Sequence, residues 1–215
     1  MATSLPQRIE TTIKSVNTQG AIQLSISVPA GMSGIVVHDY GNGLSAITHR
    51  LVSQSNSMAK MLPYRAMTHE NIPSIQTAIK VNDKVIFGNF YSNVLLIAPN
   101  EKSYSTIIKK FNKIWIHPDA YALDLMKTEE SAISKQGLKK FSQANQVGLV
   151  LIATQNRLLI LDPISQQFIG EESLNISSTK AMRPFFSRFE QMSVSEFNFS
   201  DVKLKEYYQA IQELK

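Results

Sequence analysis

The stretch Gly34-Ile35-Val36-Val37-His38-Asp39-Tyr40-Gly41-Asn42-Gly43 decides the fold of the N-terminal part of the chain. A run of β-branched residues is followed by Asn-Gly, and both positions of this dipeptide accept the positive φ that a tight hairpin turn requires. Leu44–Val52 would then return as the partner strand. The segment therefore predicts an antiparallel β-hairpin.

More short strands are predicted around this hairpin. Apolar and polar residues alternate along Ala21–Val28, as they do in a half-buried strand. The other candidates are short β-branched runs, and the full set is Thr11–Val16, Ala21–Val28, Lys84–Gly88 and Val94–Ile97. Short strands with tight turns are typical of a small barrel or sandwich. We therefore predict an all-β domain over residues 1–98.

The density of charge changes near Pro99. Residues 1–97 carry 7 basic and 4 acidic side chains, whereas residues 98–215 carry 15 and 13. The apolar period changes at the same place, because Tyr104, Ile107 and Phe111 are spaced as on one face of a helix. We therefore place a second domain, of the α/β type, at residues 99–215.

This second domain is predicted to alternate helices and strands. Asn100 is a good N-cap, and Pro118 can start a helix because proline at the first helical position loses no hydrogen bond. The predicted elements are a helix after Asn100, the strand Ile114–Ile116, a helix from His117, the helix Ser134–Asn145, the strands Val147–Ala153, Arg157–Leu161 and Gln167–Ile169, and an amphipathic helix from about Asp201. No element is predicted for Glu171–Ser200, although Arg183–Phe189 is expected to cover the core. The predicted fold class is α+β.

Composition excludes several classes of protein. The 215 residues include no cysteine, which excludes disulfides, thiolate metal sites and a cysteine nucleophile. The longest apolar run, Val147–Ala153, is far shorter than the roughly 20 residues of a transmembrane helix. The opening Met-Ala-Thr-Ser-Leu-Pro has neither a basic nor an apolar leader region. Either the protein is cytoplasmic, or a secretion signal has been removed.

Catalytic and metal-binding motifs do not stand out. The four histidines, His38, His49, His69 and His117, lack the spacing of a zinc site. His38 and His49 could meet across the hairpin, but polar residues at strand ends are the simpler interpretation. There is no phosphate loop and no Gly-x-Ser-x-Gly elbow. We expect no metal, no cofactor and no enzymatic activity, with a hydrolase whose site assembles only in space as an alternative.

The net charge of +5, with a pI near 9.3, is not concentrated. It divides into +3 (7 minus 4) and +2 (15 minus 13) over the two domains. Nucleic-acid binding needs a dense basic stripe. We therefore expect no nucleic-acid partner.

Four local strings, taken together, resemble a known family. They are Gly31-Met32-Ser33-Gly34-Ile35-Val36-Val37-His38, Val94-Leu95-Leu96-Ile97-Ala98-Pro99-Asn100, Trp115-Ile116-His117-Pro118-Asp119 and Asn145-Gln146-Val147-Gly148. In this order and spacing they resemble the N-terminal domain of the PgbA/PgbB plasminogen-binding surface proteins, over roughly residues 8 to 170. We interpret the motif residues as fold positions: Gly31, Gly34, His38, Pro99, Asn100, Trp115, His117, Pro118, Asp119, Asn145 and Gly148.

The resemblance implies an exported, non-enzymatic protein of the bacterial cell envelope, in the periplasm or at the surface. Its partner would be plasminogen or an envelope protein, and a signal peptide would have been removed. The sequence lacks the lysine-rich C-terminal extension associated with such proteins. If plasminogen binding lies in that extension, this chain would instead be a structural or adaptor module of an envelope assembly.

The last residue bears on the implied partner. Kringle modules recognise a carboxylate and an ammonium group held at a fixed distance, and a C-terminal lysine presents both. The chain ends at Lys215. Lys215 is therefore a candidate kringle-binding residue.

Overall fold

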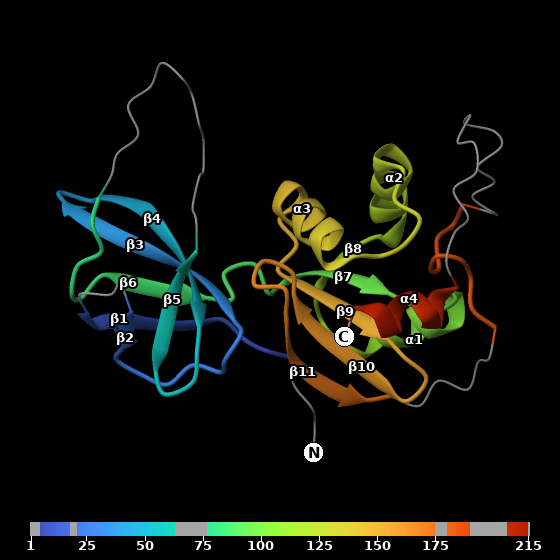
Figure 1. The fold of residues 1–215 in the computed structure, drawn as a ribbon, viewed down its shortest axis with the longest axis horizontal. Helices are drawn as coiled ribbons and strands as arrows, with labels where there is room; N and C mark the ends of the chain where they lie inside the picture. Colours follow the sequence, from blue (N-terminus) through green and yellow to red (C-terminus); the bar gives the residue numbers. More distant parts are fainter. Residues whose placement is uncertain (1–4, 18–20, 63–76, 175–179, 190–205, 215) are drawn as a thin grey trace. The chain divides into compact units, whose positions relative to one another are not determined.

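A computed structural model describes residues 5–17, 21–62, 77–174, 180–189 and 206–214. Its contacts divide the chain into two compact units. One unit is Pro6–Asn89, and the other comprises Leu5 and the chain from Phe90 onward. Each unit is described by itself below (Figure 1).

The first unit is a closed barrel of antiparallel strands in the order β1-β2-β5-β4-β3-β6. The strands are β1 (Ile9–Val16), β2 (Ile22–Leu24), β3 (Ser33–Gly41), β4 (Leu44–Ser53), β5 (Met58–Leu62) and β6 (Lys84–Phe87). The predicted hairpin is confirmed as β3 and β4, and Asn42 and Gly43 both have a positive φ in its turn. The α+β fold class, with a β-barrel first, is also confirmed.

Apolar side chains fill the barrel, and Ile13, Val36 and Phe87 are fully buried there. Gly34 gives room to one of them. A Cβ at Gly34 would lie 2.7 Å from the Cδ1 atom of Phe87, on the strand next to it. The Phe87 ring therefore occupies the space that any other residue at position 34 would need.

One strand prediction for the barrel differs from the structure, and one strand was not predicted. Ala21–Val28 forms a strand only over Ile22–Leu24, because the ladders to both neighbouring strands end there and Ile26 is exposed. The strand β5 was not predicted, since Lys60 and Met61 are both exposed and hide the alternation of apolar and polar residues.

The second unit contains a five-stranded sheet in the order β11-β10-β9-β7-β8. Its strands are β7 (Asn93–Ile97), β8 (Ile114–Ile116), β9 (Leu149–Ala153), β10 (Arg157–Asp162) and β11 (Gln167–Ser173). The helices are α1 (Glu101–Lys110), α2 (Pro118–Thr128), α3 (Lys135–Asn145) and α4 (Tyr207–Glu213). β7 is parallel to β8 on one side and to β9 on the other, while β9, β10 and β11 are antiparallel.

The order of these strands determines which helices share a face of the sheet. The chain moves from β7 to β8 through α1, and then passes back over β7 to β9 through α2 and α3. Right-handed crossovers in opposite directions lie on opposite faces of a sheet. Accordingly, the main core joins one sheet face to α2, α3 and α4 and contains no residue of α1.

The boundary between the two units lies nine residues before the one that the change of charge suggests. The strand β7 was assigned to the first domain, but it is the central parallel strand of the second sheet. The compact units therefore divide after Asn89 rather than after Ala98. Whether each unit is an independent domain stays a prediction.

Most other predicted elements agree with the structure. The helices after Asn100, His117 and Ser134 are present, and all three residues act as N-caps through their side chains. The predicted edge strand Gln167–Ile169 is present as the longer β11. The predicted start of the last helix, near Asp201, lies outside the described residues, and α4 is described from Tyr207. Within the described ranges, no helix is both long and apolar enough to span a membrane.

Candidate functional site

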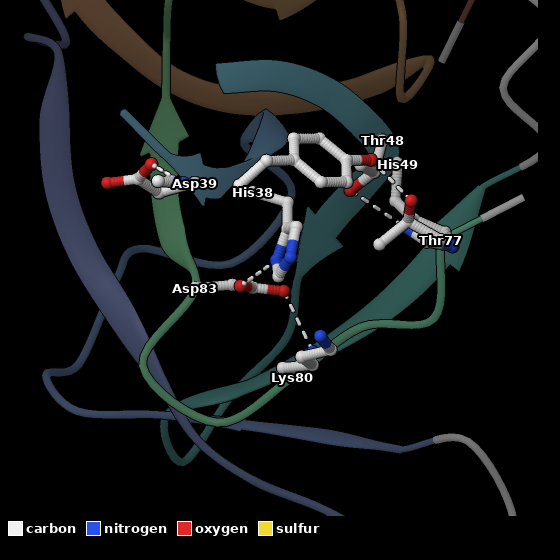
Figure 2. A network of polar contacts seen from close by, with 9 residues as sticks. His38, Asp39, Thr48, His49, Thr77, Lys80 and Asp83 are labelled. Carbon is white, nitrogen blue, oxygen red and sulfur yellow. Dashed lines mark hydrogen bonds and ion pairs between the residues drawn. The ribbon is translucent and has the colours of Figure 1, made fainter. Parts of the chain in front are cut away.

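A polar network lies at one end of the barrel, where β3 ends and β6 begins (Figure 2). We call this end the hairpin end. The Nδ1 atom of His38, on β3, donates to the Oδ1 atom of Asp83 at 2.6 Å. Both side chains are more than nine-tenths buried. This pair joins β3 to the turn that enters β6.

Backbone groups hold Asp83 in place. Its second carboxylate oxygen accepts the Lys80 N–H at 2.8 Å, so that the side chain closes the Lys80–Asp83 turn. The carbonyl of Asp83 accepts the Ile13 N–H at 3.0 Å, and the Asn82 N–H donates to the carbonyl of Ile13 at 2.9 Å. The network therefore joins β1, β3 and β6 where the barrel closes.

Two more side chains of the hairpin belong to this network. The ring of Tyr40 packs edge-on against His38 at 4.7 Å between centroids, and its hydroxyl is hydrogen-bonded to Thr77. On β4, the Nδ1 atom of His49 is hydrogen-bonded to the hydroxyl of Thr48 at 3.0 Å. Burial lowers the pKa of His49, and the nearby charge of Asp83 partly opposes this.

The His38–Asp83 pair has the geometry in which a carboxylate orients an imidazole. In a hydrolytic triad, the second ring nitrogen would then activate a hydroxyl. Among the described residues, no Ser or Thr hydroxyl is hydrogen-bonded to His38. The described part of the chain also contains no cluster of three or more His, Asp or Glu side chains that could hold a metal ion. His38 is hydrogen-bonded to Asp83, and His49 lies opposite Val36, two residues before His38 on β3.

A second polar cluster lies at the start of α2, in the other unit. His117 caps the helix, and its Nδ1 atom accepts the Asp119 N–H at 3.2 Å. Asp119 also binds Arg188, accepting the backbone N–H at 2.9 Å and the side-chain Nε–H at 2.7 Å. The cluster therefore attaches residues 180–188 to the start of α2.

Burial and nearby charges shift the pKa values of the side chains in this cluster. Burial lowers the pKa of His117, and the Arg188 charge adds to this effect, while Asp119 opposes it. The pKa of Asp119 is also lowered, because its hydrogen bonds to Arg188 outweigh the effect of burial. Burial raises the pKa of Tyr104, whose ring packs against His117 at 5.5 Å. His117 is therefore held in its neutral form, which can accept the capping N–H.

The carboxyl ends of β7 and β9 meet where α/β sheets usually bind ligands, at the point where the strand order reverses. In this chain, Tyr207 of α4 fills that position and is fully buried. Its hydroxyl lies 3.1 Å from the Ile97 carbonyl and 2.5 Å from the Ala153 carbonyl. The protein's own Tyr207 side chain thus occupies the position between the two strand ends where a ligand would bind.

The segment 180–188 covers the same edge of the sheet. Backbone N–H groups of Met182 and Phe186 donate to the carbonyls of Pro99 and Ala98. Phe185 is fully buried, and its ring stacks on that of Tyr121. The expectation that this Phe-rich stretch covers the core is confirmed.

The motif glycines occupy positions where a side chain would not fit. Gly31 has φ +89° in the turn before β3, and Gly34 makes room for Phe87. A Cβ at Gly148 would lie 2.1 Å from the carbonyl oxygen of Phe90. These three residues therefore act on the fold.

The remaining motif residues make contacts within the second unit. Asn100 caps α1 and donates to the Lys180 carbonyl at 2.9 Å. Asn145 donates to the Phe141 carbonyl one turn earlier in α3. Pro118 is the first residue of α2, and Trp115 lies on β8, opposite Val94 of β7.

Three residues of these sites were not singled out from the sequence. Asp83 is 45 positions from its partner His38, and Arg188 is 69 positions from Asp119. Tyr207 is 110 positions from Ile97 and 54 from Ala153. Periodicity and capping rules act over a few residues, so no local signal pairs them. Two of the sequence candidates, His69 and Lys215, lie outside the described residues.

These observations define a class of protein, namely an α+β chain of two compact units. One unit is a closed barrel, and the other contains a sheet whose usual ligand position is occupied by the side chain of Tyr207. The chain belongs to the family described as plasminogen-binding protein pgbA N-terminal, which matches residues 8–214. The resemblance carried by the four strings is thereby confirmed, and the match extends beyond residue 170.

Two relatives illustrate this family. The plasminogen-binding proteins PgbA of Helicobacter pylori strains J99 and 26695 are each 28% identical to the chain over 186 residues. The alignment covers 83% of this chain and 40% of each relative. The chain thus spans less than half the length of these relatives. No solved structure matches it.

Proposed function

We propose that this chain is a non-enzymatic protein-interaction module of an exported bacterial envelope protein, and that it binds plasminogen. The observation that carries this proposal is the family match over residues 8–214, with relatives named plasminogen-binding proteins. The site geometry agrees with a binding role. Its buried polar groups join strands and helices, and the usual ligand position of the sheet holds Tyr207.

Binding to immobilised plasminogen tests this function. We expect saturable binding by the native chain, and competition by a lysine analogue such as 6-aminohexanoate. A variant without Lys215 measures the part played by this lysine. If Lys215 is the kringle-binding residue, its removal should abolish the competed binding. Equal binding in all three arms would remove Lys215 from the proposal, and no binding in any arm would overturn plasminogen as the partner.

A second candidate is a structural or adaptor module. It is favoured by the alignment, because 60% of each relative lies outside the match (100 minus 40) and could hold the plasminogen site. An adaptor should co-purify stoichiometrically with envelope proteins from cells and should not bind soluble plasminogen in isolation. The opposite pair of results would favour direct binding.

The hydrolase alternative rests on the His38–Asp83 pair. A hydrolase with a serine nucleophile should react with a fluorophosphonate probe, and the reaction should depend on His38. We expect no labelling of the native chain. Labelling that is lost in His38→Gln would overturn the non-enzymatic assignment.

A further inference from the structure

The strand β8 forms one edge of the sheet in the second unit, and among the described residues it pairs only with β7. The Ile114 N–H donates to the Ser92 carbonyl at 2.9 Å, on the side of β7. Successive residues of a strand turn their backbone N–H and C=O groups to opposite sides. Those of Trp115 therefore point away from β7, and neither is bonded to another described residue.

The side chains of β8 are apolar, and one of them is largely exposed. The strand is Ile-Trp-Ile. Ile116 packs against the main core, whereas Ile114, on the same face of the sheet, is 64% exposed. Proteins protect the edges of their sheets with charged residues, prolines, bulges or short strands. β8 is short, but it contains no charge, proline or bulge.

The opposite edge of the sheet, β11, is better protected. Its pairing with β10 shifts in register near Ile169, as at a bulge. Glu171 forms an ion pair with Arg157, and Glu172 is buried. Bulges and inward-pointing charges both hinder the pairing of an edge with another strand. The less protected edge of this sheet is therefore β8.

The sequence of β8 is the same in both directions, which suits pairing with itself. About a twofold axis at Trp115, an antiparallel copy places Trp115 opposite the partner's Trp115, and Ile114 opposite the partner's Ile116. The outward N–H and C=O groups of the two tryptophans then bond to each other, as in a hydrogen-bonded pair of an antiparallel ladder. Each exposed Ile114 is covered by an isoleucine on the same face.

The charges beside β8 are compatible with this register. Lys113 comes opposite the partner's His117, which is held in its neutral form. The next charged groups along the chain are those of Asp119 and Arg188, which are bonded to each other. No two like charges are therefore placed directly opposite each other. Because this pairing uses the same edge of both copies, it closes at two chains and does not extend into a filament.

We propose that β8 pairs with β8 of a second copy of this chain, so that the two five-stranded sheets join into one. Only three residues of each strand take part, so the dimer is weak and forms as the protein concentration rises. The inference goes beyond the proposed function, because self-association requires no plasminogen.

Sedimentation of the whole chain tests the inference, up to about 1 mM, where a dimer with a millimolar Kd is half formed. We expect the native chain to shift from monomer to dimer over this range. Ile114→Lys should remain monomeric, because its ammonium group would face the partner's Ile116. Leu123→Lys is the matched control and should dimerise like the native chain, since Leu123 is a 43% exposed apolar residue of α2 in the same unit.

Trp115 provides a second measurement, because it is the only tryptophan of the chain. Its fluorescence should shift to shorter wavelength as the dimer forms. Its amide, which faces away from β7, should exchange more slowly with deuterium at high protein concentration. Both changes should be absent from Ile114→Lys, and circular dichroism verifies that this variant is folded.

Three results would overturn the inference. The first is a native chain that stays monomeric over the whole range. The second is a dimer that forms equally well in Ile114→Lys, or that is lost equally in Leu123→Lys. The third is a dimer in which the exchange of the Trp115 amide is unchanged, because the two copies would then meet at another surface.

Discussion

At the scale of single residues, the hydrogen bond between His38 and Asp83 connects β3 to the turn before β6. Their side chains are buried and bonded to each other, and Asp83 also closes the turn before β6. Removing one partner of a buried hydrogen-bonded pair leaves the other unsatisfied, which costs more than the bond itself contributes. The pair therefore stabilises the barrel regardless of any role in binding.

Asp83→Asn should lower the free energy of unfolding by about 1–3 kcal/mol, since the buried imidazole loses its charged acceptor. Urea denaturation followed by barrel-specific signals in NMR spectra measures the change. Asp39→Asn is the control, because Asp39 is exposed and accepts only a local N–H in the hairpin turn. Equal effects of the two substitutions would contradict the stabilising role proposed for the His38–Asp83 pair.

His117 makes the stability of the second unit depend on pH. Its folded pKa is lowered by burial below the ordinary value of 6.5. The unfolded chain therefore binds more protons than the folded chain between these two pKa values. The stabilisation is complete above pH 6.5 and is lost as the pH falls through this window.

The variant His117→Asn should remove this contribution while keeping an N-cap, because asparagine is a good cap and does not titrate. The difference in unfolding free energy between native chain and variant should shrink or reverse as the pH falls from 7 to about 5. An NMR titration of His117 gives the pKa directly. A midpoint above 6.5 would contradict the assigned cause.

Tyr207 connects secondary-structure elements that are far apart in the chain. The helix α4 has only seven residues, too short to be stable alone, and its position depends on buried contacts. The hydroxyl of Tyr207 lies within hydrogen-bonding distance of the ends of β7 and β9, and Ile211 and Leu214 join the main core. The C-terminal helix is thus part of the sheet's core.

Tyr207→Phe should destabilise the second unit by about 1–3 kcal/mol, because a buried carbonyl at the strand ends loses the single proton that the Tyr207 hydroxyl donates. Tyr208→Phe is a matched control in the same helix. The Tyr208 hydroxyl is buried without a partner in the described residues, so its removal should be neutral or stabilising. Thermal unfolding compares the two variants, and a larger loss for Tyr208→Phe would refute the bridging role.

Local sequence rules predicted the elements well and their assembly less well. Asn-Gly set the hairpin, and Asn100, His117 and Ser134 set three helix starts, because turns and caps involve neighbouring residues. The partners of β7 could not be found in this way. Its apolar run suits a barrel strand as well as a central parallel strand, and only pairing distinguishes them. Asp83 and Tyr207 could not be predicted for the same reason, because their partners lie far away in the sequence.

The whole molecule comprises two compact units, and the place of β7 decides where one ends. Residues 90–214 include β7, whereas residues 99–214 lack the central strand between β8 and β9. A sheet without its central strand leaves two unpaired edges and an open core.

The fragment 90–214 should therefore fold, and the fragment 99–214 should not. Amide hydrogen exchange and circular dichroism of the two purified fragments provide the comparison. A folded 99–214 fragment would restore the boundary that the change of charge suggests.

The central claim is that this chain by itself is a plasminogen-binding module of its family. The most direct test is surface plasmon resonance of the whole 215-residue chain on immobilised plasminogen, with an unrelated serum protein as reference. Saturable binding to plasminogen alone, competed by a lysine analogue, is the predicted result. Equal responses on plasminogen and the reference protein would contradict the claim.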